Sequence, residues 1–198
     1  MNWRAIDIRL FTEADYNAAL LGLDPEKRAR VEKIRQRKAK MRTVLADDLA
    51  RTLLSWALSC EKSDISFSYG EYGKPLLADG SYYFNISHSE DAVVAAVSAR
   101  PVGIDVERIR DISPSIAKKF FCYNEQVYLF GHEPSDTDYK STLSPDARMR
   151  FFELWTAKEA YLKCRGTGMT HVKTVDTTRL SFERHLLRGE YLVTIYEE

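Results

Sequence analysis

The chain has 198 residues, 44% hydrophobic and 12% aromatic, which is enough apolar content for a core in one large domain or two small ones. Basic and acidic residues each number 29, so no overall field argues for nucleic acid or a membrane as partner. Cys60, Cys122 and Cys164 form no CxxC or Cys/His pattern, which argues against a zinc site and a disulfide framework. Met1 leads into no apolar signal core and no run approaches a membrane span, so we expect a cytoplasmic protein.

The first segment predicts one strand and two helices. Residues 3–10 are mostly apolar with polar alternates, which indicates a strand. A helix start follows at 12–15 and continues to Leu21. Asp24 and Pro25 open a second helix, because Asp caps a helix and Pro suits its first turn.

Positive charge is concentrated in residues 27–42, where Glu32 is the one acidic residue. Such a segment suits a polyanionic ligand, although a solvated basic helix is its commoner meaning. RNA is a weaker interpretation, because no aromatic residues interleave the basic ones to stack on bases. A compact phosphate ligand fits better. The basic residues are Lys27, Arg28, Arg30, Lys33, Arg35, Arg37, Lys38, Lys40 and Arg42.

The rest of the first half predicts a helix, three strands and two turns. The helix covers 44–58, the strands cover 64–69, 82–87 and 92–99, and the turns cover 71–76 and 87–91. His88 in the second turn is more often a plain turn residue, but its place beside two hydroxyls suits phosphate binding. Arg100-Pro101 forms a plausible joint between halves, since Pro cannot continue a central strand.

The strand that follows carries two acids. In Gly103-Ile104-Asp105-Val106-Glu107 the side chains alternate between faces, so Asp105 and Glu107 point the same way. Two carboxylates on one face repel each other unless a cation lies between them, and Mg²⁺ prefers carboxylate oxygens. A half-buried strand with two solvated acids is the simpler interpretation.

Residues 149–165 predict a helix that Gly166 and Gly168 stop. Glu159 and Lys163 share a face with Trp155, and Lys158 lies at the edge of that face. This pattern fits an ordinary exposed Glu–Lys pair, or a metal-binding carboxylate flanked by two phosphate-binding ammoniums.

The second half otherwise predicts short elements. Helices are expected at 113–121 and from 124, an exposed loop at 131–146, and strands at 174–182 and 190–196. Each half therefore combines helices with a small antiparallel sheet. This indicates the α+β class with two similar lobes, which we place at 1–100 and 101–198.

Four motifs in series carry a resemblance to a known family. They are Gly73-Lys74-Pro75, Phe84-Asn85-Ile86-Ser87-His88-Ser89, Gly103-Ile104-Asp105-Val106-Glu107, and Trp155-Thr156-Ala157-Lys158-Glu159-Ala160 with Lys163. Together they resemble the larger, pseudo-dimeric 4′-phosphopantetheinyl transferases that activate surfactin synthetase and similar assembly lines. The resemblance implies transfer of phosphopantetheine from coenzyme A to a serine of an acyl or peptidyl carrier protein, releasing adenosine 3′,5′-bisphosphate. It also implies a monomer of two pseudo-twofold lobes with the active site in the cleft between them.

The resemblance also implies roles for individual residues. Asp105, Glu107 and Glu159 match ligands of Mg²⁺, with Mn²⁺ as an alternative ion. Lys158 and Lys163 match phosphate-contacting lysines, and Ser87 and His88 a phosphate-binding pair. The remaining coenzyme A positions are Gly73, Lys74 and Pro75 at the adenine end, and Lys27, Arg30 and Arg42 at phosphates. Glu159 is our first choice for the base that accepts the serine proton, and Glu125 or a metal-bound water is the alternative.

Two departures bear on carrier recognition. The loop from 131 to 145 aligns with no family feature, and the tail after Lys173 is short enough to abbreviate the second sheet. Arg148, Arg150 and Arg165 are candidate contacts to an acidic carrier protein on charge alone. A non-catalytic module that binds coenzyme A or an acidic partner is the main alternative, and another Mg²⁺-dependent nucleotide phosphohydrolase is a weaker one.

Overall fold

A computed structural model describes residues 1–70, 73–168 and 172–198. Within these ranges the helices are α1 (Glu13–Leu21), α2 (Pro25–Glu32), α3 (Arg37–Leu58), α4 (Ser115–Phe120), α5 (Tyr123–Phe130) and α6 (Pro145–Arg165). The strands are β1 (Asn2–Asp7), β2 (Phe67–Tyr69), β3 (Pro75–Leu77), β4 (Tyr83–Ser89), β5 (Ala92–Ser98), β6 (Val102–Arg108), β7 (Glu183–Leu187) and β8 (Tyr191–Glu197). None of these helices combines the length and apolar content that spanning a membrane requires.

The two halves of the chain repeat one topology. In the first, β1 is followed by the long helix α3 and then by the β4–β5 hairpin, and the sheet order is β1-β5-β4. In the second, β6 is followed by the long helix α6 and the β7–β8 hairpin, and the order is β6-β8-β7. All pairings are antiparallel. The expected α+β class with two similar lobes is therefore confirmed.

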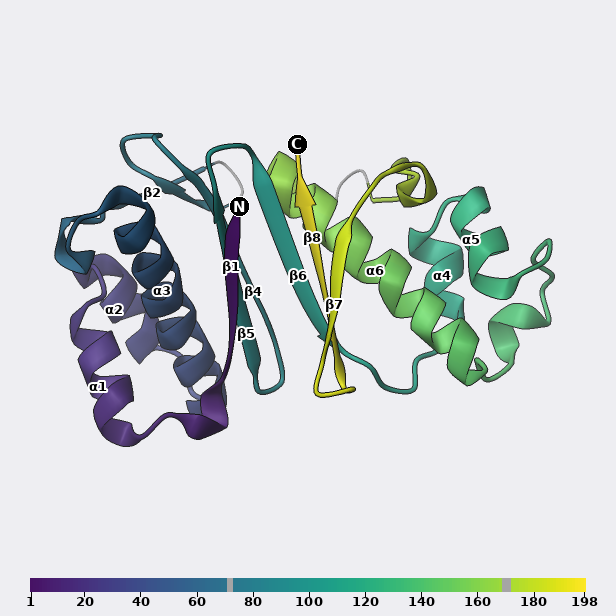
Figure 1. The fold of residues 1–198 in the computed structure, drawn as a ribbon. Coiled ribbons are helices and arrows are strands. Elements are labelled where there is room, and N and C mark those ends of the chain that lie inside the picture. The colour runs from purple at the N-terminus through teal and green to yellow at the C-terminus, as the bar shows by residue number, and fades with distance from the viewer. Residues whose placement is uncertain (71–72, 169–171) are drawn as a thin grey trace.

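The sheets form the middle of the molecule and the helices its two ends (Figure 1). Alternate residues of β5 face α3, where Val93 and Val97 join the core of the first half. The other face of β5 packs through Val94 against β6 and β8, so an apolar layer joins the two sheets. Since α6 packs against β6 and β8, these two strands are covered on both faces.

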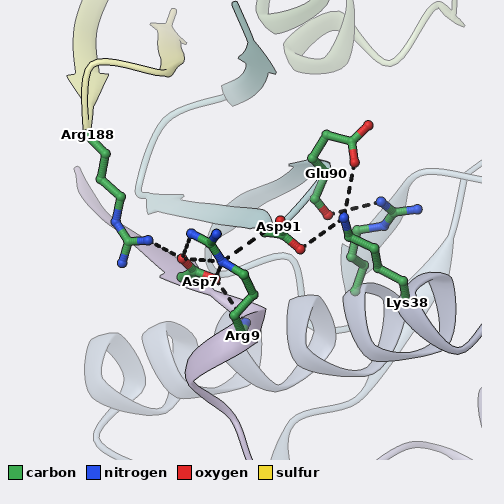
Figure 2. A network of polar contacts seen from close by, with 7 residues as sticks. Asp7, Arg9, Lys38, Glu90, Asp91 and Arg188 are labelled. Atoms are coloured by element: carbon green, nitrogen blue, oxygen red, sulfur yellow. Dashed lines mark hydrogen bonds and ion pairs between the residues drawn. The ribbon is translucent and has the colours of Figure 1, made fainter.

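An ion-pair network also joins the two halves (Figure 2). Arg188, in the turn between β7 and β8, pairs with Asp7 at the end of β1. Arg9 pairs with Asp7 at 2.7 Å and reaches Asp91 at 3.9 Å. Lys38 of α3 pairs with Asp91 at 3.0 Å. The turns of both hairpins are thereby fixed to the start of the chain.

Most predicted elements are confirmed, and the differences have local causes. The basic segment 27–42 is divided between α2 and α3, with a break at 33–36. The predicted turn at 87–91 is mostly strand, because β4 runs to Ser89 and only Glu90 and Asp91 connect it to β5. The predicted strand at 174–182 is wrong: a 3-10 turn lies at Thr177–Arg179, and β7 begins at Glu183. The second sheet is not abbreviated relative to the first. Glu71 and Tyr72 of the turn predicted at 71–76 lie outside the described residues.

Candidate active site

Asp105 lies at the junction of the two halves, on β6 where that strand passes β4. Its side chain is buried, and its Oδ1 accepts hydrogen bonds from Ser87 Oγ at 2.7 Å and Lys163 Nζ at 2.6 Å. Its Oδ2 is buried without a hydrogen-bond partner among the described residues. An unpaired carboxylate oxygen in such a place is costly unless a cation or a donor reaches it.

Glu107 and Glu159 face the same region from β6 and α6. Burial raises the pKa of Glu107, and the charge of Asp105 raises it further, while hydrogen bonds from Ser89 and Trp155 counter the shift. Burial also raises the pKa of Glu159, with the charge of Lys163 opposing and those of Asp105 and Glu107 adding to the shift. Mutual repulsion of this kind is relieved by a divalent cation.

The donor set suits Mg²⁺, because all three groups are hard oxygen ligands and no group in the described part of the chain hydrogen-bonds to Asp105 Oδ2. Among the described residues, Cys122, Glu125 and Asp176 have ligand atoms within 4.8 Å of one another, whereas the oxygens of Asp105, Glu107 and Glu159 are more widely spaced. The three acids therefore surround one region without converging as tightly as a fully formed site would.

The Cys122–Glu125–Asp176 cluster is held by hydrogen bonds. Glu125 is fully buried, and its Oε1 accepts from Thr177 N and Oγ1 while its Oε2 accepts from Cys122 N. Lys158 Nζ adds an ion pair with Oε2 at 2.8 Å. Both Glu125 oxygens are occupied, so Glu125 is a poor candidate for accepting the proton of a substrate serine.

Lys158 is placed differently from the sequence expectation. Its ammonium is fully buried, and besides Glu125 it donates to the carbonyl oxygens of Val172 and Val175, each at 2.6 Å. Three acceptors saturate the three donors of a lysine. This placement argues against a contact between Lys158 and phosphate, and it makes Lys158 the anchor of the segment after α6.

Lys163 does face the acids, since it lies one helical turn after Glu159 on α6. Its Nζ contacts Asp105 Oδ1 and also Ser87 Oγ, the latter at 2.9 Å, and its side chain is 29% exposed. Lys163 thus places a positive charge beside Asp105. Because this ammonium is partly exposed, an anion can reach it. Ser87 is buried, and its hydroxyl is hydrogen-bonded to both of these residues.

A cavity of about 230 Å³ lies beside these residues. The segment 73–75 lines it together with Asn85, Ile86, Glu159, Leu162, Lys163, Gly166 and Gly168. Lys74 Nζ donates to the carbonyl oxygens of Lys163 at 2.6 Å and Cys164 at 3.1 Å, so Lys74 joins the first half to the end of α6. Burial lowers the pKa of Lys74. The structure therefore brings Gly73, Lys74 and Pro75 to the same cavity as Glu159 and Lys163.

The basic residues expected at coenzyme A phosphates are held in different ways. Lys27 pairs with buried Asp47 at 2.5 Å, and Arg30 lies over the ring of Tyr69 at 4.7 Å. Arg42 donates to the Glu90 carbonyl at 3.0 Å, while its Nε is buried without a partner among the described residues. Arg42 is also close to His88, whose pKa is lowered first by burial and then by the charge of Arg42.

The arginines considered for carrier contacts are engaged within the chain. Arg148 pairs with Asp111, and Arg165 pairs with Glu198 at 2.5 Å. Arg150 Nε donates to the Leu129 carbonyl oxygen at 2.9 Å. Each of these contacts would compete with an acidic partner.

Sequence reasoning missed Ser89 and Asn85. Ser89 Oγ donates to Glu107 Oε2 at 2.9 Å, and Asn85 Oδ1 accepts from the Ile104 amide at 2.9 Å. The signal was present in the polar residues 85, 87 and 89, whose spacing of two places them on one face of a strand. The turn predicted at 87–91 conceals this alternation, because β4 continues to Ser89.

Comparisons with known proteins agree with the resemblance. Residues 11–100 match the model of the 4′-phosphopantetheinyl transferase N-terminal domain, and residues 101–196 match that of the 4′-phosphopantetheinyl transferase superfamily. The chain is 37% identical over 150 residues to 4′-phosphopantetheinyl transferase Sfp of Bacillus subtilis strain 168, covering 75% of this chain and 62% of the relative.

Two further relatives are similar. Identity is 42% over 128 residues to 4′-phosphopantetheinyl transferase gsp of Aneurinibacillus migulanus, covering 65% of this chain and 49% of the relative. The identity to a 4′-phosphopantetheinyl transferase of Bacillus subtilis is 31% over 180 residues. This match covers 90% of this chain and 75% of the relative. The chain therefore spans from about half to three quarters of the length of these relatives.

Proposed function

Because the chain belongs to the 4′-phosphopantetheinyl transferase superfamily, we propose that it transfers 4′-phosphopantetheine from coenzyme A to a serine hydroxyl of an apo acyl or peptidyl carrier protein. The serine oxygen forms a bond to the pantetheine-side phosphorus, and the bond from that phosphorus to the bridging diphosphate oxygen breaks. Adenosine 3′,5′-bisphosphate leaves with the electron pair, and the serine proton passes to a base. Residues 1–100 and 101–198 are the two lobes that together form the site.

One observation supports this proposal most strongly: among the described residues nothing hydrogen-bonds to the buried Oδ2 of Asp105, and Asp105 interacts electrostatically with Glu107, Glu159 and the partly exposed ammonium of Lys163. A module that only captured an acidic partner would not need three acids around one region. A Mg²⁺ held by Asp105, Glu107 and Glu159 would supply charge neutralisation at the diphosphate.

Basic side chains of the protein bind the phosphates of coenzyme A. Lys163 provides a fixed positive charge for phosphate oxygens in the cavity that it lines together with Lys74. Arg42 lies near His88, and its Nε has no hydrogen-bond partner in the part of the chain that the structure describes, so Arg42 is a further phosphate contact. These groups hold the diphosphate in place while the serine approaches, so positioning and electrostatic stabilisation carry the reaction.

Glu159 is the proposed base for the serine proton. Its carboxylate lines the same cavity as Lys163, so it lies where a serine hydroxyl would approach the phosphate. Glu125, the alternative residue, has both carboxylate oxygens occupied by donors from Cys122, Thr177 and Lys158.

The direct test incubates the protein with apo carrier protein, coenzyme A and Mg²⁺ and weighs the carrier by intact-mass spectrometry. Transfer adds one phosphopantetheine to the carrier and forms adenosine 3′,5′-bisphosphate. Carriers from fatty-acid, polyketide and peptide synthesis serve as substrates, and a working transferase as positive control. Coenzyme A binding without a mass gain on any carrier would favour the non-catalytic binding module. Hydrolysis of coenzyme A without a carrier would favour a phosphohydrolase.

A further inference from the structure

Strand β6 is an edge strand of its sheet, and no described strand pairs with its outer edge through backbone hydrogen bonds. In its sheet β6 pairs with β8, and its other edge faces β4 of the first half. Three β4 side chains accept the hydrogen bonds that a neighbouring strand would accept there. Asn85 Oδ1 accepts from Ile104 N at 2.9 Å, Ser87 Oγ from Val106 N at 3.4 Å and Ser89 Oγ from Arg108 N at 3.2 Å.

This side-chain ladder keeps the same register over its whole length. Its acceptors are two residues apart on β4, and its donors are two residues apart on β6. The two strands therefore lie side by side in a constant register. Without these side chains the buried amides of Ile104 and Val106 would lose their hydrogen-bond acceptors. The ladder therefore fixes β6, which carries the acids, against the other half of the molecule.

The two serines of the ladder make a second contact to an acid. Ser87 donates to Asp105 Oδ1 at 2.7 Å, and Ser89 donates to Glu107 Oε2 at 2.9 Å. A hydroxyl has a single hydrogen and two lone pairs. Each serine hydroxyl accepts a hydrogen bond from a β6 amide and donates one to a carboxylate. These two contacts together determine its orientation.

We propose that Ser89 is a positioning residue for the metal site, which rests on the proposed function above. Ser89 holds one oxygen of Glu107 against β4, so that the carboxylate stays aimed at the region shared with Asp105 and Glu159. Ser87 does the same for Asp105, whose second oxygen is left unpaired. Residues that orient metal ligands in this way typically change metal affinity or activity by about 10-fold to 100-fold when they are removed.

The test compares Ser89→Ala with Ser89→Thr, which keeps the hydroxyl on a strand-favouring side chain. Ser98→Ala is the matched control. Ser98 also donates to a carboxylate of the second half, Glu197, but it lies at the opposite end of the β4–β5 hairpin. Mg²⁺ affinity is measured by calorimetry with coenzyme A present and no carrier, and kcat and KM are measured separately at several Mg²⁺ concentrations.

The inference predicts that Ser89→Ala binds Mg²⁺ about 10-fold or more weakly. Its kcat should fall at limiting Mg²⁺, while its KM for coenzyme A at saturating Mg²⁺ stays near that of the wild type. Ser89→Thr should recover most of the affinity, and Ser98→Ala should match the wild type. Unchanged affinity in Ser89→Ala, or a Thr variant as weak as the Ala variant, overturns the inference.

The same measurement separates this inference from the proposed function. If the wild type binds Mg²⁺ and Ser89→Ala does not, but neither modifies a carrier, the positioning role stands and the transfer activity is refuted. If the wild type binds no Mg²⁺ even with coenzyme A present, Ser89 has no metal ligand to position and the inference is refuted.

Discussion

Gly103 of β6 packs directly against Ala160 of α6: a Cβ atom at position 103 would lie 1.9 Å from the Ala160 carbonyl oxygen and 2.5 Å from Cys164 N. Both atoms are backbone, so neither can move aside without shifting the helix. This contact sets the separation between the strand that carries Asp105 and the helix that carries Glu159.

Gly103→Ala should therefore destabilise the fold strongly. We expect a loss of about 3 kcal/mol or more in the free energy of unfolding, measured by chemical denaturation, because overpacking against backbone cannot be relieved by a rotamer change. Gly22→Ala is the control, since Gly22 has an ordinary φ of −75° and its nearest neighbour would be at 3.4 Å. Equal stability of the two variants would contradict the close approach.

Substituting the two lysines of α6 should have different effects: on stability for Lys158 and on catalysis for Lys163. Lys158→Met leaves Glu125 as an unpaired buried charge, and we expect it to cost about 3–5 kcal/mol of stability. The double variant Lys158→Met/Glu125→Gln should recover part of that loss. Lys163→Met should keep the fold but lose about 10²-fold to 10³-fold in kcat/KM, because it removes a charge at the reaction centre.

Denaturation curves and transfer kinetics measured on the same preparations distinguish these roles. A stable Lys158→Met variant with a raised KM for coenzyme A would instead support the phosphate contact that the sequence resemblance implied for Lys158.

The difference between these lysines shows what the sequence could and could not predict. Strand alternation correctly placed Asp105 and Glu107 on one face, and helical spacing placed Glu159 with Lys163, because both periods are local. The partners of Lys158 could not be predicted, since Val172, Val175 and Glu125 come to it only through tertiary packing. The Asn85, Ser87 and Ser89 ladder was missed for the same reason, as it joins strands from different halves.

Arg42 should contribute to coenzyme A binding. Its guanidinium has a buried Nε without a partner among the described residues and lies near His88. A charge-assisted hydrogen bond is worth about 1.5–3 kcal/mol, so Arg42→Ala should raise the KM for coenzyme A by about 10-fold or more with a smaller change in kcat. Arg35→Ala, which removes an exposed basic residue between α2 and α3, is the control. Equal KM values for coenzyme A in the two variants would mean that Arg42 has a structural role and does not contact coenzyme A.

The network of Figure 2 should make stability depend on acid pH. Hydrogen bonding to Arg9 holds the pKa of Asp7 at about 2, below its ordinary value of 3.8. A carboxyl with a depressed folded-state pKa stabilises the fold above its unfolded pKa, and this contribution is lost as the pH falls from about 4 to about 2. Asp7→Asn should be less stable than the wild type at pH 7 by about 1 kcal/mol.

Thermal unfolding of both proteins between pH 7 and pH 2 checks this expectation. The difference in Tm between the wild type and Asp7→Asn should narrow below about pH 4. A difference that stays constant across this range would mean that Asp7 does not stabilise the fold as a carboxylate.

The most direct measurement is calorimetric titration of Mg²⁺ into the protein with coenzyme A present, for the wild type and for Asp105→Asn, Glu107→Gln and Glu159→Gln. We predict one ion per chain for the wild type and at least about 10-fold weaker binding for every variant, with each variant still folded by circular dichroism. Three variants that bind Mg²⁺ as tightly as the wild type would contradict a cation shared by these acids.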